Sequence, residues 1–179
     1  RPEDIEVNPI TGDVFIALSN NKPKNNYHGQ ILKITENDND HGSLKFSSSI
    51  YKTGGSEGGF SCPDNMAFDR NGNLWLTTDI AGNSVEKGSY KGFGNNALFV
   101  IPASGKQAGQ AIQVASAPVD AELTGPCFSP DQKTLFLSVQ HPGETSKNLS
   151  NPTSTWPDGK KPRPSVVAIQ GDLLEKITG

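Results

Sequence analysis

The segment MAFDRNGNLWLTTD (residues 66–79) decides the fold. It consists of a short apolar run, a turn rich in Asn, Asp and Gly, and a second apolar run with polar residues at its end, which is the pattern of a β-hairpin. The same pattern occurs in IEVNPITGDVFIALSN (5–20) and in PCFSPDQKTLFLSVQH (126–141). The three hairpins recur at intervals of about 60 residues, so the sequence contains an internal repeat.

Further short apolar strands follow each predicted hairpin. A third strand is predicted at GQILKIT (29–35), NALFVIP (96–102) and PSVVAIQ (164–170), and a fourth at SLKFSSSIY (43–51) and AIQVASA (111–117). The stretches between these strands are polar and rich in glycine and have no helical periodicity, which indicates loops.

Repeats of four antiparallel strands are typical of propeller blades. The sequence therefore predicts an all-β fold, a partial β-propeller of about three four-stranded blades. The repeat units cover residues 1–61, 62–121 and 122–179. Three blades do not close a ring, and an open arc leaves unpaired strand edges. We therefore expect the chain to be part of a larger propeller, cut at the start of a blade.

Composition excludes several classes of function. The net charge is -3 and the isoelectric point is near 5.6, which argues against a nucleic-acid-binding protein because such proteins usually carry a basic stripe. No apolar run is long enough to span a membrane as a helix. The two cysteines, Cys62 and Cys127, are too few for a disulfide framework and are expected to be buried thiols, although a single bridge between them is possible.

Acidic residues stand at equivalent positions at the start of successive repeats. Alignment of the units places Glu3 and Asp64 at one position and Asp4 and Asn65 at the next, with Glu122 close by in the third unit. The inner strands of propeller blades begin near the axis, so these side chains should converge. Converging carboxylates repel one another unless a cation neutralises them, and Ca²⁺ prefers oxygen ligands. The alternative is that these residues cap strands by accepting backbone N–H bonds.

A second set of polar residues lies beside this one. Arg1 is either a surface ion pair or a contact for a phosphate or carboxylate next to a metal, which its guanidinium group suits. Asn20 and Asp79 stand at strand ends, where they either bind Ca²⁺ or close turns. His141 precedes a Pro-Gly turn and is more often structural than a ligand. The sequence has no Ser/His/Asp triad, CxxC pair or phosphate-binding glycine loop, so we expect any chemistry to be metal-assisted.

Several linked motifs resemble the C-terminal part of the PhoX-type alkaline phosphatases of bacteria. They are RPEDIEVNP (1–9), SNN (19–21), FSCPDNMAFDRNGNLWLTTD (60–79), SAPVDAELTGPCFSPDQKTLFLSVQHPGE (116–144) and STWPDGKKPRPSVVAI (154–169). The resemblance implies a secreted, calcium-dependent enzyme that hydrolyses small-molecule phosphomonoesters in the periplasm or outside the cell. It also implies a six-bladed propeller with an iron–calcium cluster at its axis. The chain would then be the C-terminal half, with an N-terminal half missing.

The resemblance also implies roles for individual residues. Arg1 would contact the substrate phosphate, and Glu3, Asp64 and Glu122 would be ligands of the Ca²⁺ and Fe³⁺ cluster. Asp4 is a further candidate ligand, and Asn20 would contact phosphate or calcium. The assignment of Asp79 as a ligand rests on its position at a strand end.

Two other functions remain open from the sequence. The string AFDRNGNLWLTTD (67–79) also resembles lactonases of the gluconolactonase type, which are propellers with one divalent metal. The third hypothesis is a non-catalytic propeller that acts as a binding scaffold, with strand caps in place of metal ligands.

Overall fold

The strands predicted from the sequence are all present. The structure, a computed structural model, describes residues 1–178, apart from the side chain of Asn39. In chain order, its strands are β1 (Pro2–Val7), β2 (Val14–Leu18), β3 (Gln30–Glu36), β4 (Phe46–Thr53), β5 (Pro63–Phe68), β6 (Leu74–Thr78), β7 (Ala97–Ile101), β8 (Ile112–Ser116), β9 (Glu122–Phe128), β10 (Leu135–Gln140) and β11 (Ser165–Ile169).

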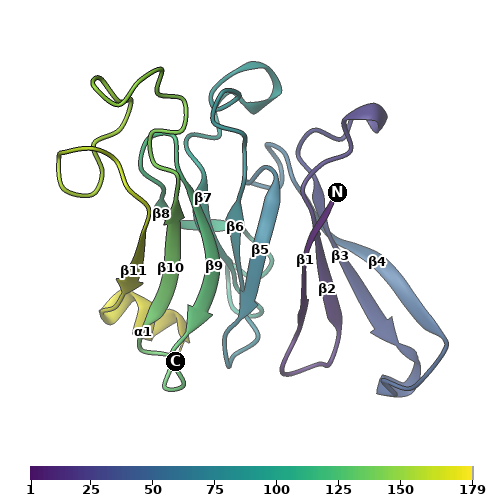
Figure 1. Cartoon of the computed structure of the whole chain (residues 1–179). Helices are drawn as coiled ribbons and strands as arrows, with labels where there is room; N and C mark the ends of the chain where they lie inside the picture. Colours follow the sequence, from purple (N-terminus) through teal and green to yellow (C-terminus); the bar gives the residue numbers. More distant parts are fainter. Residues whose placement is uncertain (179) are drawn as a thin grey trace.

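The strands form three antiparallel sheets that stand side by side in the order of the chain (Figure 1). The first sheet has the order β1-β2-β3-β4 and the second the order β5-β6-β7-β8. The third has three strands, in the order β9-β10-β11. Strand β5 packs against both β1 and β9, so the first strand of each sheet faces the first strand of the next. This arrangement confirms the predicted partial propeller, in which each sheet is a blade.

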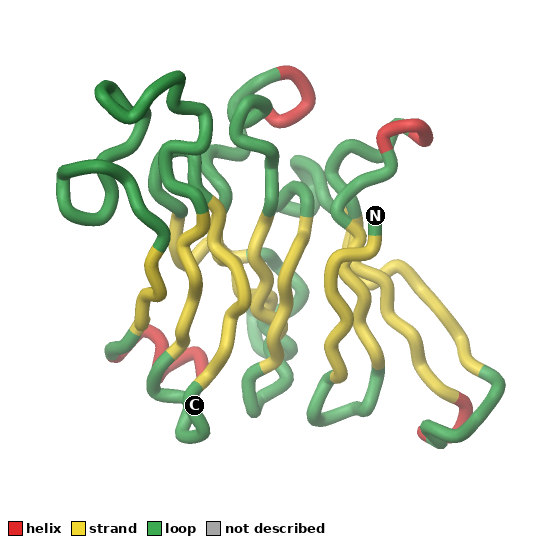
Figure 2. Tube along the Cα trace, viewed as in Figure 1, coloured by secondary structure: helices red, strands yellow, loops and turns green. Residues whose placement is uncertain are grey.

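Helices are short and lie between or after the strands (Figure 2). They are the 3-10 turns η1 (Lys22–Lys24), η2 (Asn37–Asn39) and η3 (Gly88–Tyr90) and the α-helix α1 (Asp172–Thr178). In the third blade, α1 follows β11 at the place in the chain where the other two blades have a fourth strand. Within residues 1–178, no helix has the length and apolar character needed to cross a membrane.

The hairpin turns have the chemistry that their sequences predict. In the first, the Asn8 side chain accepts N–H bonds from Ile10 (2.8 Å) and Thr11 (3.2 Å), and Gly12 has a φ of 74°. In the second, Asp69 accepts the N–H of Asn71 (3.0 Å). These bonds between a side chain and the nearby backbone hold β1 against β2 and β5 against β6.

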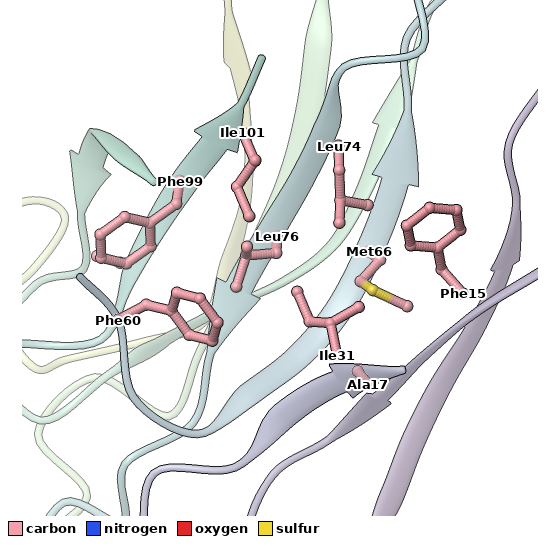
Figure 3. Packing of buried hydrophobic residues seen from close by; sticks show 10 residues of the cluster. Phe15, Ala17, Ile31, Phe60, Met66, Leu74, Leu76, Phe99 and Ile101 are labelled. Carbon is pink, nitrogen blue, oxygen red and sulfur yellow. The ribbon is translucent and has the colours of Figure 1, made fainter. Parts of the chain in front are cut away.

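Each interface between blades is an apolar core. One cluster lies between the first and second sheets, as Figure 3 shows, and a second lies between the second and third. Aromatic rings meet edge to face across both interfaces: Phe15 packs on Phe68 with centroids 5.0 Å apart, and Trp75 packs on Phe128 at 5.4 Å. The middle strand of one blade therefore places an aromatic ring on the inner strand of the next.

The same positions are exposed at the two ends of the arc. Phe136, the repeat equivalent of Phe15 and Trp75, is 41% exposed. Val7, the equivalent of Phe68 and Phe128, is 52% exposed. These two residues occupy the positions at which a further blade would pack.

The aromatic side chain at this repeat position should contribute more to stability inside the arc than at its end. Replacing the buried Phe15 by Leu removes edge-to-face contacts with Phe68 and Tyr51, and we expect it to lower the free energy of unfolding by about 1–2 kcal/mol. The same change at the exposed Phe136 should lower it by less than about 0.5 kcal/mol. Urea denaturation followed by tryptophan fluorescence measures both values, and equal losses would contradict the difference in packing between the inside of the arc and its end.

Candidate functional site

The predicted site residues lie at one end of the blades. The inner strands begin there and the middle strands end there, because each pair is joined by its hairpin turn at the other end. In Figure 1 this end carries the N-terminus and the long loops. It brings together Glu3, Asp64, Asp79 and Glu122, which we call the acidic rim.

Arg1 is held at the acidic rim by several contacts. Its Nε donates to Glu3 Oε1 at 2.7 Å, and a terminal guanidinium nitrogen lies 3.8 Å from Asp79 Oδ2. The Ser19 hydroxyl also donates to Glu3 Oε1, at 2.8 Å. The backbone nitrogen of Arg1 donates to the carbonyl oxygen of Asn20 at 2.9 Å. Burial opposes the ionisation of Glu3, but the bonds from Ser19 and Arg1 outweigh it and lower the pKa of this carboxyl group.

A cavity of about 50 Å³ opens beside Arg1. Arg1, Asn20 and Asp79, all selected from the sequence, line it together with Lys22 and Tyr90. Two cationic side chains and an amide therefore face one small polar space. Such a set of donors suits an anion with several oxygen atoms.

The carboxylates of the acidic rim influence one another strongly. Burial, with added repulsion from Asp79 and Glu3, raises the pKa of Asp64 to about 6. Burial and repulsion from Asp79 raise the pKa of Glu122 to about 7, and a hydrogen bond with Asp79 adds to this shift. His141 acts in the opposite direction, with its Nε2 3.4 Å from Glu122 Oε1. The rim therefore concentrates more negative charge than its own cations offset.

The donors of the acidic rim fit calcium by type, but they do not form a closed site. All four rim residues offer carboxylate oxygens, which are the ligands that Ca²⁺ prefers. Within residues 1–178, however, no three His, Cys, Asp or Glu side chains converge closely enough to hold an ion by themselves. The predicted ligand roles of Glu3, Asp64 and Glu122 remain predictions, and an ion at this rim would need donors beyond those in the described part of the chain.

The thiol near the site is packed in the protein interior. Cys62 lines the small cavity but is buried, and burial raises the pKa of its thiol. Its Sγ lies 3.5 Å from the carbonyl oxygen of Tyr27. This environment agrees with the prediction that Cys62 is a packed thiol. Cys127, expected to be buried, is exposed on β9, because its side chain lies on the free face of an inner strand.

Asp4 and Asn65 join the blades. Asp4 Oδ2 accepts the backbone N–H of Met66 in the next inner strand at 2.7 Å, and its Oδ1 accepts the N–H of Ile5 at 2.8 Å. Asn65, at the equivalent position, accepts the N–H of Gly125 at 2.9 Å. For these two residues the contacts favour the strand-cap interpretation over metal binding.

Sequence reasoning missed several residues of the cavity wall. Lys22 directly follows the SNN motif, so its distance from Asn20 along the chain was a usable signal. Tyr90 lies in the glycine-rich loop between β6 and β7, and nothing in its local sequence indicates that the loop folds back over the rim. Its ring is buried against Cys62, and burial raises the pKa of its hydroxyl to about 12.

Comparison with known families identifies the chain. Residues 1–143 match the family model described as alkaline phosphatase PhoX. The chain belongs to the PhoX family. This match confirms the resemblance inferred from the RPEDIEVNP and related motifs, and it favours a phosphatase over the lactonase and scaffold hypotheses.

A solved PhoX structure has the same fold. It is Pseudomonas fluorescens PhoX in complex with vanadate, a transition state analogue, and it matches with a TM-score of 0.80 and 31% sequence identity. The match covers 95% of this chain and 33% of the other, so this chain spans about a third of the length of that PhoX chain. A comparison with curated proteins gave no match.

The raised pKa values predict how pH affects stability when a chelator removes divalent cations. A carboxyl group whose pKa is higher in the folded state favours folding at low pH, and this contribution is lost as the pH rises. Asp64→Asn should therefore gain stability relative to the wild type between about pH 4 and pH 6. Glu122→Gln should gain stability relative to the wild type over a higher pH range, up to about pH 7.

Urea midpoints measured from pH 3.5 to pH 8 test both variants. If the difference between either variant and the wild type did not change with pH, its carboxyl group would not have the environment described above.

Proposed function

We propose that this chain supplies part of the active site of a calcium-dependent alkaline phosphatase that hydrolyses small phosphomonoesters. One observation carries the proposal: a cavity lined by Arg1, Asn20 and Lys22 lies directly beside a group of carboxylates. An anion site next to cation ligands is what metal-assisted phosphoryl transfer requires. Because the chain spans about a third of the related PhoX, hydrolysis is proposed for the whole protein that contains it.

The acidic rim would hold calcium through Glu3, Asp64, Asp79 and Glu122. Calcium would neutralise these carboxylates and polarise the phosphoryl oxygens of the ester. The Fe³⁺ that the family resemblance implies would need ligands outside this set. Cys62 is packed against Tyr27 and Tyr90 and is not proposed as one of them.

Arg1 would stabilise the negative charge that develops on the phosphoryl group. Its Nε is committed to Glu3, which fixes the plane of the guanidinium group. Its terminal nitrogens, one of which lies 3.8 Å from Asp79, could donate to phosphoryl oxygens in the cavity that Arg1 lines. Asn20 and Lys22 would contribute further donors from the end of β2 and from η1. Glu3 therefore acts both as a calcium ligand and as the group that positions Arg1.

The open faces at the two ends of the arc support the proposal that this chain is part of a larger propeller. The exposed apolar side chains of Ile5 and Val7 on β1, and of Phe136 and Val166 on the third blade, would be covered by further blades. These blades, the missing part of the propeller, would supply the remaining ligands. Location in the periplasm or outside the cell is proposed from the family resemblance alone.

Replacement of Arg1 tests the phosphate contact. In the complete gene product, Arg1→Lys keeps the charge but removes the forked donor, and we expect kcat/KM for p-nitrophenyl phosphate to fall by about 100-fold. Arg163→Lys is the matched control, because Arg163 is exposed and pairs with Asp158 at 2.8 Å in a loop. Equal activity of the Arg1 variant and the wild type would refute the role of Arg1.

Calcium binding can be tested without measuring activity. Saturating Ca²⁺ should raise the Tm of the complete gene product, because an ion that binds only the folded state stabilises it. Glu122→Gln should reduce this rise in Tm. Glu36→Gln should not, because Glu36 pairs with His41 at the opposite end of the blades. An undiminished rise in Tm for the Glu122 variant would exclude Glu122 as a ligand.

A further inference from the structure

A large cavity lies at the end of the blades opposite the acidic rim. Its volume is about 790 Å³, within the range of about 300–1,000 Å³ that is usual for small-molecule sites. The turn between β5 and β6, the turn between β7 and β8, and helix α1 form its walls. In Figure 1, α1 lies at the opposite end of the third blade from the long loops, so this cavity is separate from the candidate active site.

The floor of the cavity is apolar. Val100 of β7 and Ile112 of β8 lie on one side, and Leu173 and Ile177 of α1 lie on the other. Leu173 is 66% exposed. The helix turns Leu173, Lys176 and Ile177 toward the cavity because residues three and four apart lie on the same face. An apolar chain placed here would remove the exposed side chain of Leu173 from water.

The rim of the cavity is basic. Arg70, Lys106 and Lys176 line it, and no acidic residue does so. Arg70 donates to two neutral acceptors, the side-chain oxygen of Gln132 (3.2 Å) and the carbonyl oxygen of Asp131 (2.5 Å), so its charge is not neutralised. Within residues 1–178, none of the three basic groups has a carboxylate within 4.0 Å. In the part of the chain that the structure describes, three cationic side chains without a carboxylate partner therefore surround one apolar floor.

We propose that this cavity binds an amphiphilic organic anion. The carboxylate or phosphate head of the ligand lies among Arg70, Lys106 and Lys176, and its apolar chain lies against Ile112 and Leu173. The acidic rim cannot substitute for this site, because its cavity of about 50 Å³ is too small for an apolar chain and is flanked by carboxylates. The proposal goes beyond the phosphatase function and does not depend on it.

Decanoate is the probe that tests this site. Titration of the complete gene product with decanoate, followed by isothermal calorimetry, should show saturable binding to one site. Decyltrimethylammonium has the same tail with a cationic head, and acetate has the head without the tail, so both should bind at least about tenfold more weakly. Equal affinity for the cationic amphiphile would overturn the proposal, because binding would then not depend on the basic rim.

Three variants locate the binding. The double change Lys106→Glu and Lys176→Glu should weaken decanoate binding by about tenfold or more. Lys160→Glu with Lys161→Glu, in the exposed loop before β11, makes the same change in net charge and should have little effect. Leu173→Asp places a carboxylate beside the floor at an exposed position that folding does not require, and it should also weaken binding by about tenfold.

Two further outcomes would refute the proposal. One is an equal loss of affinity in both lysine double variants, which would show that only net charge matters. The other is binding to phosphatidylglycerol vesicles in the absence of any decanoate binding, which would indicate that the basic rim contacts a membrane surface and that the cavity holds no free anion. Circular dichroism melting of each variant shows whether it is folded.

Discussion

The close approach of the inner strands β1, β5 and β9 is the constraint on which the rest of the structure depends. Two side-chain-to-backbone bonds fix it, from Asp4 to Met66 and from Asn65 to Gly125. Because side chains alternate along a strand, a shift of one residue in this packing would turn the rim carboxylates away from one another. The apolar cores between the blades provide most of the stabilisation, and these polar bonds set the register.

Holding the carboxylates of the acidic rim in this register lowers the stability of the fold. Burial and mutual repulsion raise the pKa values of Asp64 and Glu122, so part of the stability from the blade cores is used to hold charged groups together. Arg1 lowers the pKa of its direct partner, Glu3, but its charge only partly offsets the rise in the pKa of Asp64. Carboxyl groups whose pKa values are raised by burial and by neighbouring charges are typical of functional sites.

The fold could be predicted almost completely from the sequence. Alternating apolar residues and turn residues such as Gly12 and Gly72 are local signals, so the strands were found in their correct places. Equivalence between repeats then placed Glu3 near Asp64, because a propeller brings the same position of each blade to the same end. The equivalence of the repeats did not show that Asp64 faces the acidic rim while Asn65 bonds to the next blade. These different roles depend on the direction in which each side chain points. The cavity wall formed by Tyr90 depends on the path of a loop without periodicity, which no local pattern predicts.

The two ends of the arc differ in shape, and this gives the assembly a polarity. One end presents the aromatic ring of Phe136, and the other presents the smaller Val7, at positions that meet in each interface within the chain. Contacts between unlike surfaces are heterologous, so each added unit reproduces the same rotation. A further blade would therefore join this arc head to tail.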